Sequence, residues 1–405
     1  MAKVLARVGA ALRSGLGGAW LAGGTWGLAA LTATGCTQEH WVGSAGFRAQ
    51  RTVDAQLVGL RQPILASGDL DGDGRADVAV LDADARRLCL LYSQADPAAQ
   101  AKSLSSPSCE TLSESDAPQQ VVIARLVPGG RAQLVLAGRS LLLFPPLTGG
   151  ALPAPRLRLP LLSPVQRLVV QRLPTPAAGS GYEIIWSIPN SAAASSPEAT
   201  AWAAASLDSN GQSAAQLAAA AYPLPSQPSA FLPHTTAAGQ RQIFVASDRG
   251  IDLLQSRGDS QALPCPARFA DSQALAVVDG NDDGRADLLA LRPDGRPALL
   301  LRAADDSAFD GSCSSDVATP LADQALLQLL PADFDGDGRI DLAATSPDRD
   351  PGLLLWRSGQ PVLRYPLSTP AQAATLAFRN ADARADVVLL LRDGTLLRLV
   401  NTFPL

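Results

Sequence analysis

The chain has 405 residues, of which 47% are hydrophobic and 18% are charged, and its formal net charge is −5. This balance excludes a disordered chain, because the apolar fraction is too high and the charged fraction too low. The basic residues are almost all arginines and form no cluster along the sequence, which excludes the basic surface that nucleic-acid binding needs. The length suits two or three domains, unless one repeat architecture occupies all of it.

Residues 1–35 have the layout of a secretory signal peptide. Lys3, Arg7 and Arg13 give a positive start, and an uncharged, mostly apolar run follows over 14–35. The many glycines of this run make it a poor permanent membrane helix. We therefore expect residues 1–35 to be removed during export.

The end of this segment, LTATGC over 31–36, is similar to the lipobox of bacterial lipoproteins, in which the cysteine is diacylated. Ala33 stands where the lipobox prefers leucine. The resemblance implies lipidation of Cys36, with 36–50 as a tether, and export by the general secretory route to the cell envelope as an outer-membrane lipoprotein. The alternatives are an ordinary signal peptide cut nearby, which gives a secreted or periplasmic protein, and an uncleaved anchor.

Internal repeats organise the rest of the chain. Residues 67–81 (SGDLDGDGRADVAVL), 277–291 (VVDGNDDGRADLLAL) and 331–345 (PADFDGDGRIDLAAT) each join an acidic, glycine-containing loop to a short apolar run that suits a strand. Four weaker copies keep the same rhythm. The last polar position of each copy gives seven anchors, spaced by 45 to 59 residues: Asp77, Gln133, Glu183, Gln242, Asp287, Asp341 and Asp386.

This period predicts an all-β, seven-bladed β-propeller of four-stranded antiparallel blades over 51–405. Asp-Gly at 393–394 and Asn-Gly at 210–211 predict hairpin turns. The alanine-rich stretch over 192–222 is therefore interpreted as a hairpin, with a helical insertion as the alternative. Residues 47–56 are predicted to supply the outer strand of the last blade and so close the ring.

The acidic loops have the chemistry of calcium sites. Oxygen ligands at positions 1, 3, 5 and 9 converge on one point, glycine at position 6 permits a sharp turn, and position 7 offers a backbone carbonyl. An EF-hand is excluded, because position 12 holds Val80, Ala290 or Ala344 in place of glutamate. The predicted ligands are Asp69, Asp71, Asp73, Arg75 and Asp77; Asp279, Asn281, Asp283, Arg285 and Asp287; and Asp333, Asp335, Asp337, Arg339 and Asp341.

These repeats resemble the FG-GAP or VCBS family, which builds the seven-bladed propeller of integrin alpha subunits and occurs in many secreted bacterial proteins and some lectins. The resemblance implies about three structural Ca²⁺ ions, which clamp the hairpin between the first two strands of a blade. In the seventh unit the corresponding positions are Phe378, Asn380, Asp382, Arg384 and Asp386. The loss of the first ligand, together with Ala383 in place of glycine, predicts an empty or weak site there.

Four cysteines remain after Cys36. Cys89 and Cys109 lie in one unit and are expected to form a disulfide, which leaves Cys265 to pair with Cys313 across adjacent units. Four buried thiols are the alternative. No pair has CxxC spacing, so metal binding by these cysteines is not expected.

The sequence contains no recognised catalytic motif. We therefore expect a monomeric, non-catalytic binding or scaffold protein that recognises a protein or glycan partner through its loops, with a lipid anchor and no affinity for nucleic acid. Two alternatives remain open. A lectin would repeat an aromatic or polar pocket in successive blades, and a polysaccharide-active enzyme would gather carboxylates on the face opposite the calcium loops.

Overall fold

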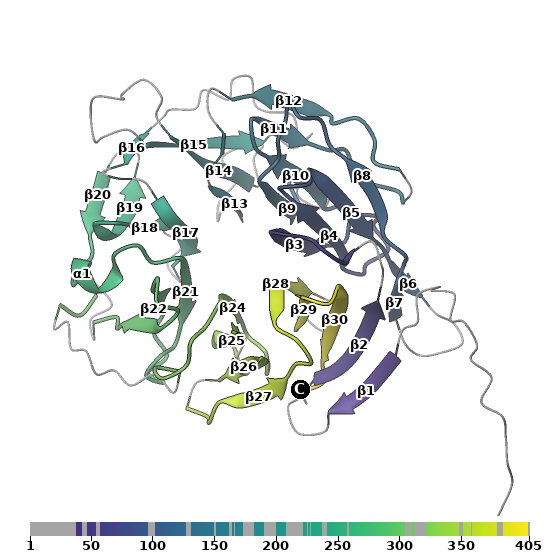
Figure 1. The fold of residues 1–405 in the computed structure, drawn as a ribbon. Coiled ribbons are helices and arrows are strands. Elements are labelled where there is room, and N and C mark those ends of the chain that lie inside the picture. Colours follow the sequence, from purple (N-terminus) through teal and green to yellow (C-terminus); the bar gives the residue numbers. More distant parts are fainter. Residues whose placement is uncertain are drawn as a thin grey trace, which may run out of the picture. The chain divides into compact units, whose positions relative to one another are not determined.

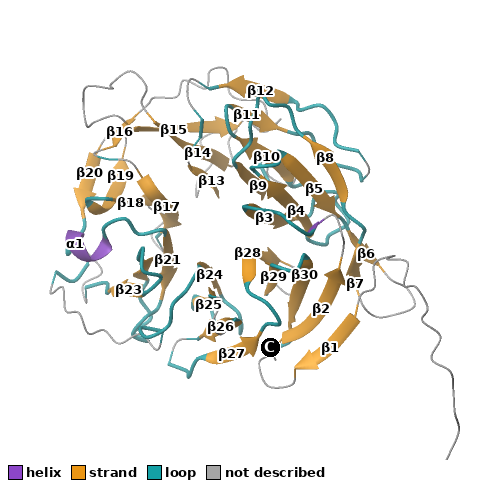
Figure 2. Cartoon of the chain, viewed as in Figure 1, coloured by secondary structure: helices purple, strands orange, loops and turns teal. Residues whose placement is uncertain are grey.

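In the computed structural model, short β-strands form nearly all of the regular secondary structure of the described residues (Figures 1 and 2). The structure describes residues 38–42, 47–53, 57–95, 102–126, 131–149, 151–161, 164–165, 167–172, 182–189, 200–207, 222–224, 226, 228–236, 241–256, 259–303, 309–311, 321–347, 351–357, 359–378 and 384–403. All of them belong to one compact unit, Gly35–Leu405.

Within the described residues, seven antiparallel sheets of three to five strands follow one another along the chain, together with a separate two-stranded sheet. The first sheet contains β3 (Pro63–Gly68), β4 (Asp77–Asp82), β5 (Arg87–Leu91) and β8 (Ser108–Thr111). The second contains β9 (Gln120–Ala124), β10 (Gln133–Ala137), β11 (Ser140–Leu143) and β12 (Leu157–Pro160). The third contains β13 (Arg167–Arg172), β14 (Tyr182–Pro189), β15 (Thr200–Leu207) and β16 (Tyr222–Leu224).

The remaining sheets continue the same pattern. The fourth contains β17 (Pro228–Thr235), β18 (Arg241–Ser247), β19 (Gly250–Ser256) and β20 (Asp259–Ala262). The fifth contains β21 (Ala274–Val278), β22 (Asp287–Leu291) and β23 (Pro297–Leu300). The sixth contains β24 (Gln328–Ala332), β25 (Asp341–Ser346), β26 (Gly352–Trp356) and β27 (Leu363–Pro366). The seventh contains β28 (Ala371–Phe378), β29 (Ala385–Leu391), β30 (Thr395–Asn401), β2 (Phe47–Val53) and β1 (Gln38–Val42).

The sheets are arranged in a ring with their first strands innermost (Figure 1). Each first strand contacts the first strand of the next sheet, in the order β3, β9, β13, β17, β21, β24, β28 and back to β3. This arrangement is an all-β propeller of four-stranded antiparallel blades. The blades are less uniform than predicted: in the described part of the chain the fifth sheet has three strands, and the seventh has five because β1 adds to its outer edge.

The core lies between neighbouring sheets. Along β4, Val78 and Val80 pack against the seventh sheet, whereas Ala79 and Leu81 pack against the second sheet. Because successive side chains of a strand point to opposite faces, a strand covered on both faces must be apolar at every position. This explains why the second strands appear in the sequence as continuous apolar runs.

The seventh sheet joins the two ends of the described chain. β2 pairs antiparallel with β30, from Phe47 opposite Asn401 to Val53 opposite Thr395, which confirms the predicted outer strand. The predicted tether over 36–50 needs correction, however, because β1 and the first residues of β2 are already part of this sheet. Pairing with β2 covers the edge that β30 would otherwise expose.

The predicted hairpins are present as strand pairs. Gly394, with φ 82°, lies in the turn between β29 and β30. β15 pairs with β16, so the stretch over 192–222 contributes strands, while its Asn-Gly turn lies outside the described residues. A separate two-stranded sheet joins β6 (Ser93–Ala95) and β7 (Lys102–Leu104), and α1 (Pro266–Phe269) is short. Among the described residues, no helix has the length and apolar character needed to cross a membrane.

Candidate functional site

The three acidic loops connect the first strand of a sheet to its second strand, in the first, fifth and sixth sheets. The last aspartate of each loop begins the second strand and is almost completely buried: Asp77, Asp287 and Asp341. The Oδ2 atom of Asp77 accepts a hydrogen bond of 2.8 Å from the backbone N–H of Leu70, and its Oδ1 atom accepts one of 2.8 Å from the N–H of Ser93. This carboxylate therefore ties the loop to the chain that follows the third strand.

Burial makes these three carboxylates costly to ionise. Desolvation raises the pKa of Asp77 and of Asp341 to about 7, and that of Asp287 to about 6. Backbone hydrogen bonds to each carboxylate partly oppose the shift. Neighbouring carboxylates add to it, since like charges disfavour ionisation. A bound cation is the chemical partner that would relieve both burial and repulsion.

Two of the loops gather carboxylates closely enough to share a metal ion. In the first loop, carboxylate oxygens of Asp69, Asp71 and Asp77 all lie within 4.8 Å of one another. In the third loop the same holds for a different set, Asp333, Asp335 and Asp337. These all-oxygen donors fit the ligand preference of Ca²⁺.

The second loop differs from the other two. Asn281 replaces an aspartate at position 3, and its amide N–H donates a 2.8 Å hydrogen bond to Asp283. Asp282 stands at position 4 with φ 61°, where the other loops have Gly72 and Gly336. This left-handed backbone is unfavourable for residues other than glycine, although aspartate tolerates it better than most.

The arginines at position 7 use their side chains to neutralise acidic groups. Arg75 forms an ion pair with Asp73 in its own loop, and Arg285 pairs with Asp283 at 2.6 Å. Arg339 of the third loop pairs instead with Asp282 of the second loop and so links two neighbouring sheets. The sequence pattern alone predicted a role only for the backbone carbonyls of these arginines.

In the seventh sheet, the last polar residue of the repeat pairs with an arginine of the third strand. Asp386 is buried at 2% exposure, and its Oδ2 atom accepts a 2.8 Å hydrogen bond from Nη2 of Arg398, which is 5% exposed. Cross-strand register places Arg398 where the three acidic-loop sheets have Leu90, Leu299 and Leu355. Phe378 is exposed, Arg384 is buried, and Asn380 and Asp382 lie outside the described residues.

Three of the cysteines lie among the described residues. Cys89 on β5 and Cys109 on β8 are opposite each other and form a disulfide. Cys265 is also disulfide-bonded, whereas Cys313 and Cys36 lie outside the described residues.

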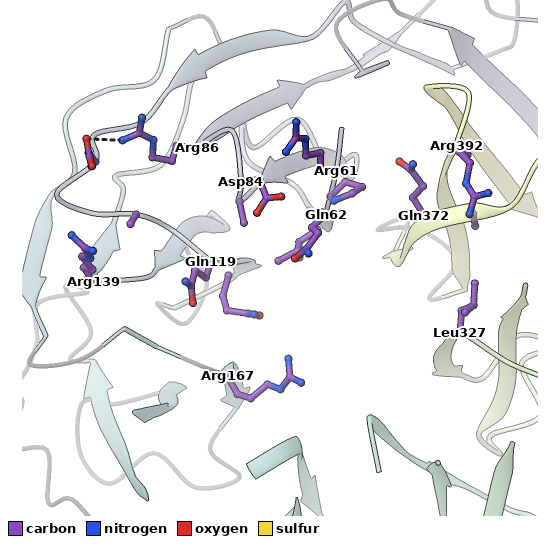
Figure 3. A pocket seen from close by; sticks show the side chains of 17 residues that line it. Arg61, Gln62, Asp84, Arg86, Gln119, Arg139, Arg167, Leu327, Gln372 and Arg392 are labelled. Carbon is purple, nitrogen blue, oxygen red and sulfur yellow. Dashed lines mark ion pairs between the residues drawn. The ribbon is translucent and has the colours of Figure 1, made fainter. Parts of the chain in front are cut away.

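A pocket of about 1010 Å³ opens at the centre of the ring (Figure 3). Its lining comes from five different sheets. The residues belong to the beginnings of first strands, to the segments just before first strands, and to the turns between second and third strands. Five arginines and four glutamines dominate it, with two acidic residues: Arg61, Arg86, Arg139, Arg167, Arg392, Gln62, Gln119, Gln120, Gln372, Asp84 and Glu114. None of the described residues that line it is aromatic.

The pocket lies on the face opposite the acidic loops. β3 begins at Pro63, which lines the pocket, and ends at Gly68, immediately before the first acidic loop. Six residues of a strand span about 20 Å, so the two features are separated by roughly the thickness of the ring. The three acidic loops therefore lie on one face of the propeller, and the arginines of the pocket lie at the mouth of the other.

No sequence motif marks this pocket, because its residues come from distant segments of the chain. One signal was available. Arginines recur in the turn after the second strand, as Arg86, Arg139 and Arg392. In a ring of sheets, turns of the same type lie on the same face, so a residue repeated there marks a shared surface.

No family model and no curated protein matches the sequence. Among solved structures, the chain is similar to BBS1N in complex with ARL6DN, in crystals soaked with lead (TM-score 0.57, 11% identity, 89% of this chain and 97% of that chain) and with mercury (TM-score 0.56, with the same identity and coverage). Sqt1 of Saccharomyces cerevisiae gives a TM-score of 0.48 at 11% identity, over 85% of this chain and 97% of that one. The similarity to BBS1N at this identity shows a shared fold.

Proposed function

We propose that the chain is a non-catalytic binding protein of the cell envelope, and that it recognises a protein partner at the arginine-rich mouth of its ring. In this proposal the ring is a seven-bladed propeller of the FG-GAP or VCBS type, stabilised by calcium on its opposite face. Seven successive sheets and the repeated acidic loops support that assignment.

The observation that carries the proposal is the pocket itself. Side chains from five sheets converge on one opening, so the site exists only in the folded ring (Figure 3). Loops on a rigid scaffold are the usual location of binding residues. Arginine is favoured where carboxylates are to be recognised, because its planar group offers paired donors.

Calcium is proposed as a structural component. Asp69, Asp71 and Asp77 would hold one ion, and Asp333, Asp335 and Asp337 would hold another. The second loop would complete its set with the amide oxygen of Asn281. Bound calcium would neutralise the buried carboxylates and fix the connection between first and second strands.

Location at the envelope rests on the N-terminal segment and on the cysteines. The signal-like residues 1–35 and the proposed lipidation of Cys36 would export and anchor the protein. The disulfide between Cys89 and Cys109 supports an oxidising compartment, since such bonds are rare in the cytosol.

A protein partner is favoured over a glycan. The part of the pocket lining that the structure describes offers no aromatic ring on which a sugar could stack. A solved structure of the same fold, BBS1N, is in complex with another protein, ARL6DN, which supports a protein partner by analogy of fold alone.

Site-specific photo-crosslinking tests this proposal. A photoreactive residue is placed at Gln372, in the pocket, and in a matched variant at Ser260, which is exposed on the outer strand β20. With an envelope fraction, we expect defined protein adducts at position 372 and none at position 260. Equal labelling at both positions would refute recognition at the mouth, and binding on a glycan array without protein adducts would favour a lectin.

A further inference from the structure

The pocket has a chemistry that indicates what kind of partner it accepts, and the following inference rests on the proposed function. We propose that the pocket binds an acidic peptide segment of the partner protein. Carboxylates of the peptide pair with Arg61 and Arg139, and its backbone amides hydrogen-bond with the glutamines of the lining.

The charge of the pocket is opposite to that of the chain. Five arginines against two acidic residues leave an excess of positive charge at the mouth, although the whole sequence has a net charge of −5. A concave site of one sign concentrates its field and attracts ligands of the other sign. An anionic ligand is therefore favoured over a neutral or cationic one.

Two of the arginines are available for such a ligand. In the described part of the chain, the guanidinium groups of Arg61 and Arg139 have no hydrogen-bond or ion-pair partner. By contrast, Arg86 pairs with Glu114 at 3.3 Å, and Nε of Arg167 donates a 2.9 Å hydrogen bond to the carbonyl of Ser229. Figure 3 shows Arg61 and Arg139 well separated within the lining, with Asp84 and Gln119 drawn between them, so a ligand that reaches both must be extended.

The glutamines distinguish a peptide from a simple anion. Each side-chain amide offers donors and an acceptor, as Gln62, Gln119 and Gln372 do around the opening. A peptide group presents one N–H and one C=O, which an amide can satisfy together. A fully ionised phosphate has no donor for the acceptor oxygen of an amide. An acidic sugar would find no aromatic ring to stack on among the described lining residues.

The size of the pocket suits a segment of several residues. Its volume of about 1010 Å³ lies at the upper limit of typical small-molecule pockets. An acidic stretch in an extended conformation could enter while the rest of the partner remains outside. We therefore infer recognition of a segment and not of a whole folded surface.

Fluorescence anisotropy tests the inference with the full chain and a fluorescein-labelled peptide of alternating Glu and Gly. A peptide of alternating Gln and Gly is the neutral probe. The test variant is R61Q/R139Q, and the control is R296Q, because Arg296 is exposed in the corresponding turn of the fifth sheet and does not line the pocket. We expect the acidic peptide to bind and the double variant to lose at least about tenfold in affinity, as for lost charge-assisted contacts.

The control variant should bind the peptide as the original chain does, and R61K/R139K should recover part of the affinity. Equal binding by R61Q/R139Q and the original chain would overturn the inference, as would an equal loss in R296Q. If the chain binds polygalacturonate but not the acidic peptide, the ligand is an acidic glycan. If inorganic phosphate competes fully with the peptide, the pocket is a simple anion site. If the peptide fails while adducts at position 372 persist, the inference falls and the proposed function stands.

Discussion

The buried ion pair between Arg398 and Asp386 of the seventh sheet allows a quantitative test of what stabilises this sheet. We predict that Arg398→Leu destabilises the protein by about 3 to 5 kcal/mol, the usual cost of leaving one partner of a buried pair uncompensated. Nε and Nη2 of Arg398 donate to Oδ2 of Asp386 at 3.2 and 2.8 Å, and both side chains are at most 5% exposed. The variant places leucine where the acidic-loop sheets already have it.

The double variant Asp386→Asn with Arg398→Leu removes both charges. We expect it to regain most of the lost stability, because a pair replaced by neutral groups of similar size is often close to neutral in free energy. The remaining hydrogen bond of 2.9 Å, from the backbone N–H of Asn401 to Oδ1 at position 386, can persist with the asparagine side chain.

Urea unfolding monitored by tryptophan fluorescence gives the free energy of unfolding for each variant. A loss below about 1 kcal/mol for R398L, or a double variant no more stable than the single one, would refute the reasoning.

Three further predictions concern the loops and turns. Calcium should raise the melting temperature more at about pH 7.5 than at about pH 5.5. Burial raises the pKa of Asp77, Asp287 and Asp341 to about 6 or 7, so protons replace the metal below that range. Equal shifts of the melting temperature at both pH values would contradict metal binding at these residues. Replacing Cys89 and Cys109 by alanine should lower the free energy of chemical unfolding by about 3 kcal/mol, since the disulfide closes a loop with a sequence separation of 20. An unchanged unfolding midpoint would show that the disulfide does not constrain the unfolded chain. Gly394→Ala should lower the melting temperature more than Gly338→Ala, although both glycines have φ above 80°. An added Cβ at position 394 would lie 2.7 Å from Val58, whereas one at position 338 would meet nothing within 4 Å. Equal losses in melting temperature would argue against the contact with Val58.

The repeat pattern predicted the part of the fold that is local in sequence. Each anchor from Asp77 to Asp386 lies in the second strand of a separate sheet, because a strand covered on both faces requires a continuous apolar run directly after its loop. The closure by residues 47–53 was also predictable, since β30 needed a partner. The start of the propeller was placed too late because β1 is short and carries no repeat signature.

The candidate sites were predictable only where their residues are close in sequence. The acidic loops were found because all ligands of one site lie within nine residues. Arg398 was missed because it contacts Asp386 across two strands, and sequence patterns contain no register. The pocket was missed for the same reason on a larger scale, since only ring closure brings Arg61 and Arg392 to one opening.

Pairing of β2 with β30 has a consequence for how the protein forms. β2 lies near the beginning of the sequence and β30 near its end. The contact that closes the ring therefore joins residues that are synthesised early with residues that are synthesised late. Contacts of such high sequence separation form slowly, because chain entropy must be lost before they contribute stability. We expect the ring to close late and as a single event. A chain interrupted before β28 would leave the first and sixth sheets each with an uncovered apolar face, which makes incomplete copies prone to aggregation and to removal.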